Sequence, residues 1–154
     1  MKNILTALLL ILSMVVSAKK EKTELEYDKK TGVVTVDGAS VFKVIEEKSS
    51  NHPGMKDYTI QSLEGKNLLL LVFDNYEDYH KVSQSNPNGK VNYYKVIFFD
   101  AIKSRCEIGY NIFKSIMKTI HTNRLIKDGE LDTEKVEIFV TKNGIRFTEL
   151  KDRR

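Results

Sequence analysis

Hydrophobic and polar positions follow two different periods along this chain of 154 residues. In the first two thirds, residues 33–36 are β-branched and residues 58–63 alternate between apolar and polar side chains, a pattern typical of β-strands. Residues 68–73 are apolar at every position, and residues 93–99 are apolar at both odd and even positions. Because neighbouring side chains of a strand point to opposite faces, these two runs predict central strands covered on both faces.

Turn signals separate the predicted strands. Asp37-Gly38 is the strongest, because a two-residue type I′ hairpin turn requires positive φ angles at both central residues. Residues 49–54 contain Ser, Asn, Pro and Gly and predict a loop. The polar stretch from Asp74 to Lys90 predicts a long exposed loop between the two apolar strands.

The hydrophobic period lengthens after residue 103. Apolar side chains recur three or four positions apart, at Cys106, Tyr110, Phe113, Met117 and Ile120. This spacing places them on one side of a helix and predicts an amphipathic helix over residues 104–123.

A second, shorter helix is predicted over residues 133–142, begun by Asp132 or Thr133, and its β-branched content leaves a strand as the alternative. Residues 145–148 predict a terminal strand or a docked tail. Strands that precede helices along the chain are typical of α+β proteins. We therefore expect a single α+β domain over residues 25–150: an antiparallel β-meander of about six strands, covered by one long and one short C-terminal helix.

The first residues resemble a secretory signal peptide. Lys2 is followed by an apolar run from Ile4 to Val16, and Ser17-Ala18 ends it with small side chains. These features predict cleavage after residue 18, and the run is shorter than the roughly 20 residues of a membrane span. Residues 19–24 are charged and predict a flexible lead. The expected location is the periplasm or the extracellular space.

The charge and the cysteine content limit the classes of partner and of membrane attachment that we expect. The net charge of +4 is small and spread along the chain, which argues against a nucleic-acid partner. Cys106 is the single cysteine, so no disulfide within the chain is possible, and Lys19 stands where a lipoprotein has its acylated cysteine. We therefore expect no lipid anchor and no membrane insertion after signal cleavage. The oligomeric state stays open, since an edge strand of the meander can pair between chains.

The sequence contains few residues that could form a metal, cofactor or catalytic site. His52, His80 and His121 are far apart in sequence, so no metal site and no cofactor are predicted. The acidic group Asp74, Glu77 and Asp78 lacks the alternating spacing of a calcium loop and is interpreted as an exposed charged loop. No catalytic residue is assigned. The alternative is a small secreted hydrolase in which folding brings a histidine, for instance His80, next to a carboxylate.

The tyrosines suggest a binding surface. Tyrosine combines a broad apolar ring with a polar tip and is common in recognition surfaces. The candidate ligand-binding residues are Tyr76, Tyr79, Tyr93, Tyr94 and Asn88. Tyr93 and Tyr94 are adjacent on a predicted strand, so one is expected to point into the core and the other outward.

A signal peptide, a lysine-rich meander with Val36-Asp37-Gly38, and a C-terminal Leu125–Leu131 segment reading LIKDGEL occur together in this chain. In this it resembles the small uncharacterised exported proteins of Bacteroidota-type bacteria. The resemblance implies a periplasmic or secreted setting and no activity. We expect a soluble, non-enzymatic binding module whose partner is an envelope or secreted protein, a glycan or a peptide. An inhibitor or immunity-type protein is a further alternative.

Overall fold

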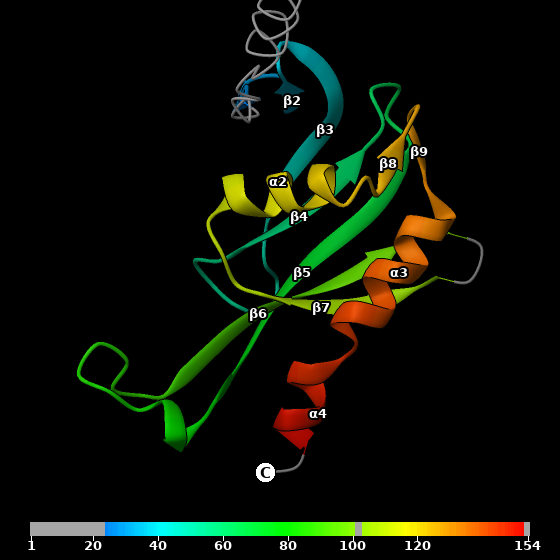
Figure 1. The fold of residues 1–154 in the computed structure, drawn as a ribbon. Coiled ribbons are helices and arrows are strands. Elements are labelled where there is room, and N and C mark those ends of the chain that lie inside the picture. The colour runs from blue at the N-terminus through cyan, green and yellow to red at the C-terminus, as the bar shows by residue number, and fades with distance from the viewer. Residues whose placement is uncertain (1–23, 101–102, 153–154) are drawn as a thin grey trace, which may run out of the picture.

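A computed structural model describes residues 24–100 and 103–152 (Figure 1). The predicted signal peptide and residues 19–23 of the predicted lead lie outside the described residues. Strands come first along the chain and helices follow. The main sheet contains β1 (Leu25–Tyr27), β2 (Val33–Val36), β3 (Ala39–Lys48), β4 (Lys56–Gln61), β5 (Asn67–Glu77), β6 (Lys90–Phe98) and β7 (Arg105–Gly109).

Each strand of this sheet pairs antiparallel with the next, in the order β1-β2-β3-β4-β5-β6-β7, so the sheet is an open meander with β1 and β7 at its edges. The predicted turn at Asp37-Gly38 joins β2 to β3 with φ angles of 51° and 80°. The α+β fold class and the antiparallel meander are thus confirmed. The two apolar strands, β5 and β6, are neighbours in the sheet.

The C-terminal part contains α2 (Phe113–Thr122), the small hairpin β8 (Ile126–Lys127) and β9 (Glu130–Leu131), α3 (Thr133–Asn143) and α4 (Arg146–Asp152). The carboxylate of Asp132 accepts a 3.1 Å hydrogen bond from the Lys135 backbone N–H and so caps α3. Of the two alternatives left open for residues 133–142, the helix is therefore the correct one. Residues 145–148 were expected to form a terminal strand or a docked tail, but residues 146–152 form the helix α4.

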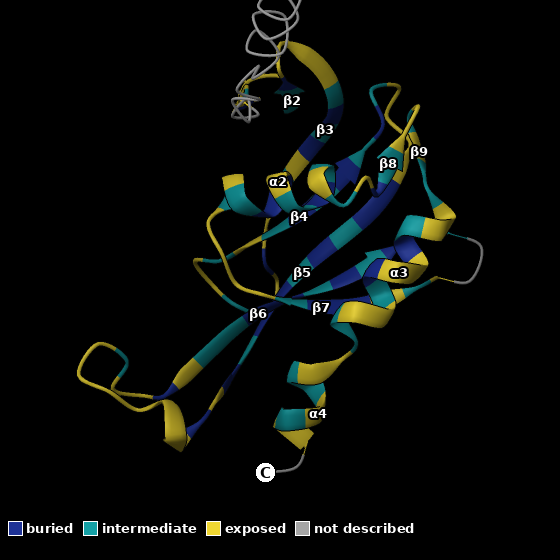
Figure 2. Cartoon of the chain, in the orientation of Figure 1, coloured by how far each residue is buried: buried dark blue, intermediate teal, exposed yellow. Residues whose placement is uncertain are grey.

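One face of the sheet packs against α2 and α3 and forms the hydrophobic core (Figure 2). Its largest members include Phe42, Ile60, Leu71 and Phe98 from the strands, and Met117 and Phe139 from the helices. Phe98 and Phe139 meet edge to face with ring centroids 6.4 Å apart. Burial of these side chains supplies the main favourable free energy of folding.

The helix predicted over residues 104–123 begins later than expected. Residues 105–109 form β7 instead, and α2 starts at Phe113. In β7, Cys106 lies opposite Val96 and Ile108 lies opposite Tyr94, so both join the core as alternate positions of a strand. The helix prediction for Cys106, which rested on its spacing from later apolar residues, is wrong because pairing with β6 makes this segment a strand.

The expectation that β5 is covered on both faces is wrong for the middle of the strand, although Leu68 near its start is buried. Leu69, Leu71 and Phe73 are buried against the helices, whereas Leu70 and Val72 on the opposite face are only half-buried. The strand is apolar on both faces even though the helices α2 and α3 cover one of them.

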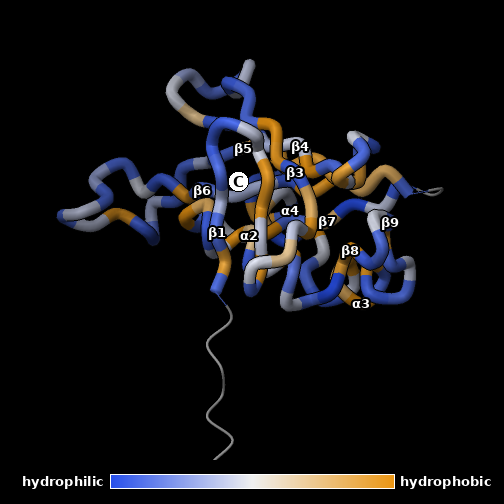
Figure 3. The backbone as a smooth tube through the Cα atoms, turned by 90° about the horizontal axis from the view of Figure 1, so that it is seen from above, coloured by the Kyte–Doolittle hydropathy of each residue, from blue (hydrophilic) through white to orange (hydrophobic). Residues whose placement is uncertain are grey.

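β5 and β6 extend beyond their neighbours as a two-stranded arm. β5 pairs with β4 only as far as Leu71, while the pairing of β5 with β6 continues to Glu77 and Lys90. The predicted loop from Asp74 to Lys90 is therefore shorter, because its first four residues belong to β5. Figure 1 shows the arm reaching away from the body, and Figure 3 shows that its tip is mostly hydrophilic.

Candidate functional site

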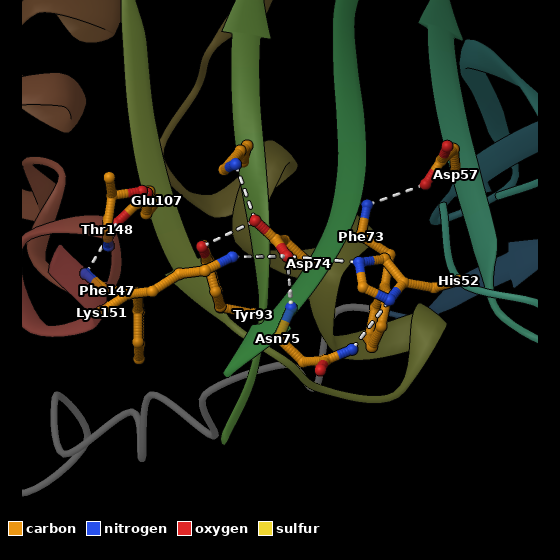
Figure 4. Close-up of polar contacts among 11 residues, drawn as sticks. His52, Asp57, Phe73, Asp74, Asn75, Tyr93, Glu107, Phe147, Thr148 and Lys151 are labelled. Atoms are coloured by element: carbon orange, nitrogen blue, oxygen red, sulfur yellow. Dashed lines mark hydrogen bonds and ion pairs between the residues drawn. The ribbon is translucent and has the colours of Figure 1, made fainter. Parts of the chain in front are cut away.

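Asp74 lies at the root of the arm, where β5 leaves the larger sheet (Figure 4). Its direct cross-strand neighbour is Tyr93 of β6. The Tyr93 hydroxyl donates a 2.9 Å hydrogen bond to Oδ2 of Asp74, and the Asn75 backbone N–H donates a 2.7 Å bond to Oδ1. Asp74 and Tyr93 are both buried, so the hydrogen bonds of the Asp74 carboxylate come from the protein rather than from bulk water.

Two lysines balance the charge of Asp74. The Nζ of Lys95 lies 2.7 Å from Oδ2, and the Nζ of Lys151 lies 3.5 Å from Oδ1. Burial by itself raises the pKa of Asp74, but the hydrogen bonds from Lys95, the Asn75 N–H and Tyr93 outweigh it and lower the pKa well below its usual range. Asp74 is therefore a carboxylate at neutral pH.

His52, from the β3–β4 loop, completes the root of the arm. Its Nε2 lies 3.2 Å from Oδ1 of Asp74, and its Nδ1 lies 3.0 Å from Nδ2 of Asn75. The amide of Asn75 donates to Nδ1, so the hydrogen of a neutral ring is assigned to Nε2. The ring also meets Phe73 edge-on, with centroids 5.2 Å apart. Both ring nitrogens are thus occupied, which ties the β3–β4 loop to the arm.

Glu107 of β7 holds α4 against the other side of this cluster. Its Oε2 accepts hydrogen bonds of 2.7 Å and 3.0 Å from the backbone N–H groups of Phe147 and Thr148, and its Oε1 accepts from the Thr148 hydroxyl. A carboxylate is favourable at the start of a helix, where N–H groups lack partners within the helix. The Phe147 ring stacks on Tyr93, with centroids 5.0 Å apart and planes 15° from parallel.

The tip of the arm is held by side-chain and backbone hydrogen bonds. Nδ2 of Asn86 donates to the carbonyls of Lys81 and Lys90, and Oδ1 accepts from the Lys90 N–H. The Asp78 carboxylate accepts from the His80 N–H and caps the 3₁₀ turn η2 (Tyr79–Lys81). Residues 78–89 therefore form a structured tip.

This structured tip displays large side chains. Tyr79 is 74% exposed and Val82 is 54% exposed. The Tyr79 ring lies against the His80 ring, with centroids 3.8 Å apart. The exposed colour of the tip in Figure 2 contrasts with the buried positions along the arm's strands. An aromatic and an aliphatic side chain are thus exposed at the tip of the arm.

The five candidate ligand-binding residues are not brought together on one surface. Tyr79 and Asn88 are exposed at the tip, whereas Tyr76, Tyr93 and Tyr94 are buried. The expectation that either Tyr93 or Tyr94 points outward is wrong. Each faces a different side of the sheet as predicted, but Tyr94 joins the core and Tyr93 is covered by α4.

Among the described residues, folding brings His52 next to the carboxylate of Asp74, whereas no carboxylate pairs with the ring of His80. Asp74 was predicted to lie in an exposed charged loop, and this interpretation is wrong, because Asp74 is buried and His52 lies against its carboxylate. The sequence does contain a signal for this buried cluster, because Asp74 directly follows the apolar run 68–73 and Lys95 interrupts the apolar run 93–99. Charged residues within apolar strands are expected to be paired when they are buried.

Comparison of the chain with models of protein families, with curated proteins and with solved structures found no match. Within the described residues, no group of three or more His, Cys, Asp or Glu side chains is placed to hold a metal ion. No helix in residues 24–100 or 103–152 is long and apolar enough to cross a membrane.

Proposed function

We propose that the protein is an exported, non-enzymatic binding module of the cell envelope or the extracellular space that contacts its partner through the tip of the arm. The observation that carries this proposal is the structured tip, which displays Tyr79 and Val82. Binding costs less conformational entropy when the contact residues are ordered beforehand. Tyrosine is also among the residues that contribute most to binding energy in interfaces.

The structure of the arm root supports this function. His52, Tyr93, Lys95 and Lys151 all converge on Asp74, and they come from a loop, a strand and a helix that are separate in sequence. Such a cluster opposes bending of a two-stranded ribbon, which is weak by itself. The cluster therefore holds the tip in one direction relative to the body, as a binding arm requires.

The expected partner is an envelope or secreted protein. An exposed aromatic ring beside an exposed aliphatic side chain complements an apolar pocket rimmed by polar groups, which is typical of protein interfaces. The signal-peptide features of residues 1–18 support the location.

A small hydrolase is the second candidate, because folding does bring His52 to 3.2 Å from Asp74. In a hydrolase the second ring nitrogen would accept a proton from the nucleophile. Here Nδ1 of His52 is occupied by the Asn75 amide. This hydrogen bond favours a structural role for the His52–Asp74 pair and therefore favours the binding module over the hydrolase.

Affinity capture from a cell-envelope extract tests the proposal. The bait is the chain from Lys19 onward, and the test variant is the double substitution Tyr79→Ala and Val82→Ala. The matched control is Ile112→Ala with Ile138→Ala, which removes two apolar side chains of similar exposure elsewhere. We expect one partner to be retained by the wild type and the control but lost by the test variant. Equal retention by all three baits would contradict the proposal.

A further inference from the structure

The open face of the sheet carries a row of side chains that crosses five strands. Register places Ile45 opposite Thr59, Thr59 opposite Leu70, Leu70 opposite Ile97, and Ile97 opposite Arg105. Directly opposed residues share a face of the sheet. This face lies opposite the one that packs against α2 and α3, and we call these five residues the transverse row.

The transverse row is apolar for most of its length and accessible. Ile45 is 41% exposed, Thr59, Leu70 and Ile97 are half-buried, and Arg105 is exposed at the β7 end. Strands lie about 4.8 Å apart, so the row spans about 10 Å from Arg105 to Leu70 and about 19 Å to Ile45.

A groove lies at the Arg105 end of the transverse row. It has a volume of about 250 Å³ and lies between β6, β7 and the start of α4, with Lys95, Ile97, Arg105, Glu107, Ile145 and Thr148 among its lining residues. Ile145 is 49% exposed, although it lies between two helices that pack on the protein. Ile97 lines the groove and also belongs to the transverse row, so the groove adjoins the apolar part of the row.

The charges around this groove leave an excess of one cation. Lys95 and Lys151 share the single carboxylate of Asp74, and the Glu107 carboxylate accepts three hydrogen bonds from α4 but pairs with no cation among the described residues, so three cations face two carboxylates once Arg105 is included. Within the described residues, Arg105 takes part in no ion pair. A guanidinium is well suited to bind a carboxylate, because its N–H groups match the two oxygens.

We propose that the groove and the transverse row bind a single-chain anionic amphiphile, such as a free fatty acid. The carboxylate lies at Arg105 and Lys95, and the acyl chain runs over Ile97 toward Leu70. The binding energy comes from covering half-buried apolar side chains, and the excess positive charge selects an anionic head group. This site is separate from the arm tip and does not depend on the proposed function.

Titration calorimetry of the full chain with decanoate, below its micelle-forming concentration, tests the proposal. We expect saturable binding that tightens about two- to fourfold for each added methylene in a series from octanoate to dodecanoate. Decyltrimethylammonium has an apolar chain of the same length and the opposite charge, and it should bind at least tenfold more weakly. Acetate, which keeps only the head group, should show no measurable binding.

Matched variants locate the site. Arg105→Ala should weaken decanoate binding at least fivefold, whereas Lys118→Ala, which removes an exposed cation on α2, should leave it unchanged. Ile145→Ser should weaken binding, whereas Ile138→Ser, at a similarly exposed isoleucine of α3, should not. Arg105→Lys keeps the charge and should recover part of the affinity. Circular dichroism of each variant checks that the fold is retained.

Two results would overturn the proposal. One is the absence of saturable decanoate binding to the folded wild type. The other is equal binding of decanoate and decyltrimethylammonium, which would indicate non-specific association with apolar surface. In the first case, protein capture that depends on Leu70 and Ile97 would assign the face to a protein partner instead.

Discussion

The hydroxyl of Tyr93 donates a 2.9 Å hydrogen bond to the carboxylate of Asp74, its direct neighbour across β5 and β6. The pair lies where the two-stranded arm leaves the seven-stranded sheet. Burial and the adjacent Asp74 charge raise the pKa of Tyr93, so the phenol keeps its proton and stays a donor at all physiological pH values. The Tyr93–Asp74 contact thus connects the orientation of the arm with the packing of α4.

Replacing Tyr93 by phenylalanine should destabilise the protein by about 1–2 kcal/mol, because a hydrogen bond to a charged acceptor is lost while the ring still stacks on Phe147. Urea unfolding followed by circular dichroism measures this loss. Tyr110→Phe removes a hydroxyl from a half-exposed ring and should change the free energy of unfolding by less than about 0.5 kcal/mol. Equal effects of the two substitutions would argue against the Tyr93–Asp74 bond.

Asp74→Asn should cost about 1–3 kcal/mol at pH 7, since two lysines and a buried phenol lose their anionic partner. The pKa of Asp74 is lowered in the folded state, so its contribution is complete above the unfolded-state pKa of about 3.9 and is lost as the pH falls below that value. The stability difference between wild type and variant should therefore shrink below about pH 4.

Unfolding free energies measured at several pH values between 7 and 2.5 provide this test. Asp152→Asn, at an exposed position of α4, is the control and should follow the wild type throughout. A difference between wild type and Asp74→Asn that stays constant down to pH 2.5 would contradict the lowered pKa.

Glu107→Gln should loosen α4 and destabilise the protein by about 1 kcal/mol, because the negative charge beside the first N–H groups of the helix is removed. Hydrogen exchange should show lower protection for the amides of Phe147 and Thr148. Glu137→Gln changes an exposed carboxylate of α3 and should leave these amides protected. Unchanged protection in Glu107→Gln would mean that the Tyr93–Phe147 stack alone holds α4.

Gly89→Ala should disrupt the tip of the arm. Gly89 has a φ angle of 60°, and a Cβ atom there would lie 2.1 Å from the Asp78 carbonyl oxygen. Gly54→Ala is a matched control, since its φ of 87° imposes similar backbone strain but no atom lies within 4 Å of the added Cβ. Hydrogen exchange at Asp78 and Ser83, whose N–H groups bond within the tip, should rise in Gly89→Ala only.

Much of the fold could be predicted from the sequence. Residues 33–36 and 68–73 fall in strands, as do residues 58–61 of the predicted 58–63 and residues 93–98 of the predicted 93–99. The turn at Asp37-Gly38 is present, and a helix covers residues 113–122. Side-chain period and turn chemistry are local properties, which is why they can be recognised without the partner segments. The order of strands before helices was sufficient for the α+β class.

The tertiary structure alone determined which segments meet. Residues 105–109 contain helical spacing, yet pairing with β6 makes them a strand. Tyr93 is buried because α4, more than fifty residues later, covers it, and Asp74 is buried because Tyr93, Lys95 and His52 converge on its oxygens. Contacts between distant segments depend on the free energy of the whole packed chain, so local periodicity predicts the strands and the helix but not the cluster that orients the arm.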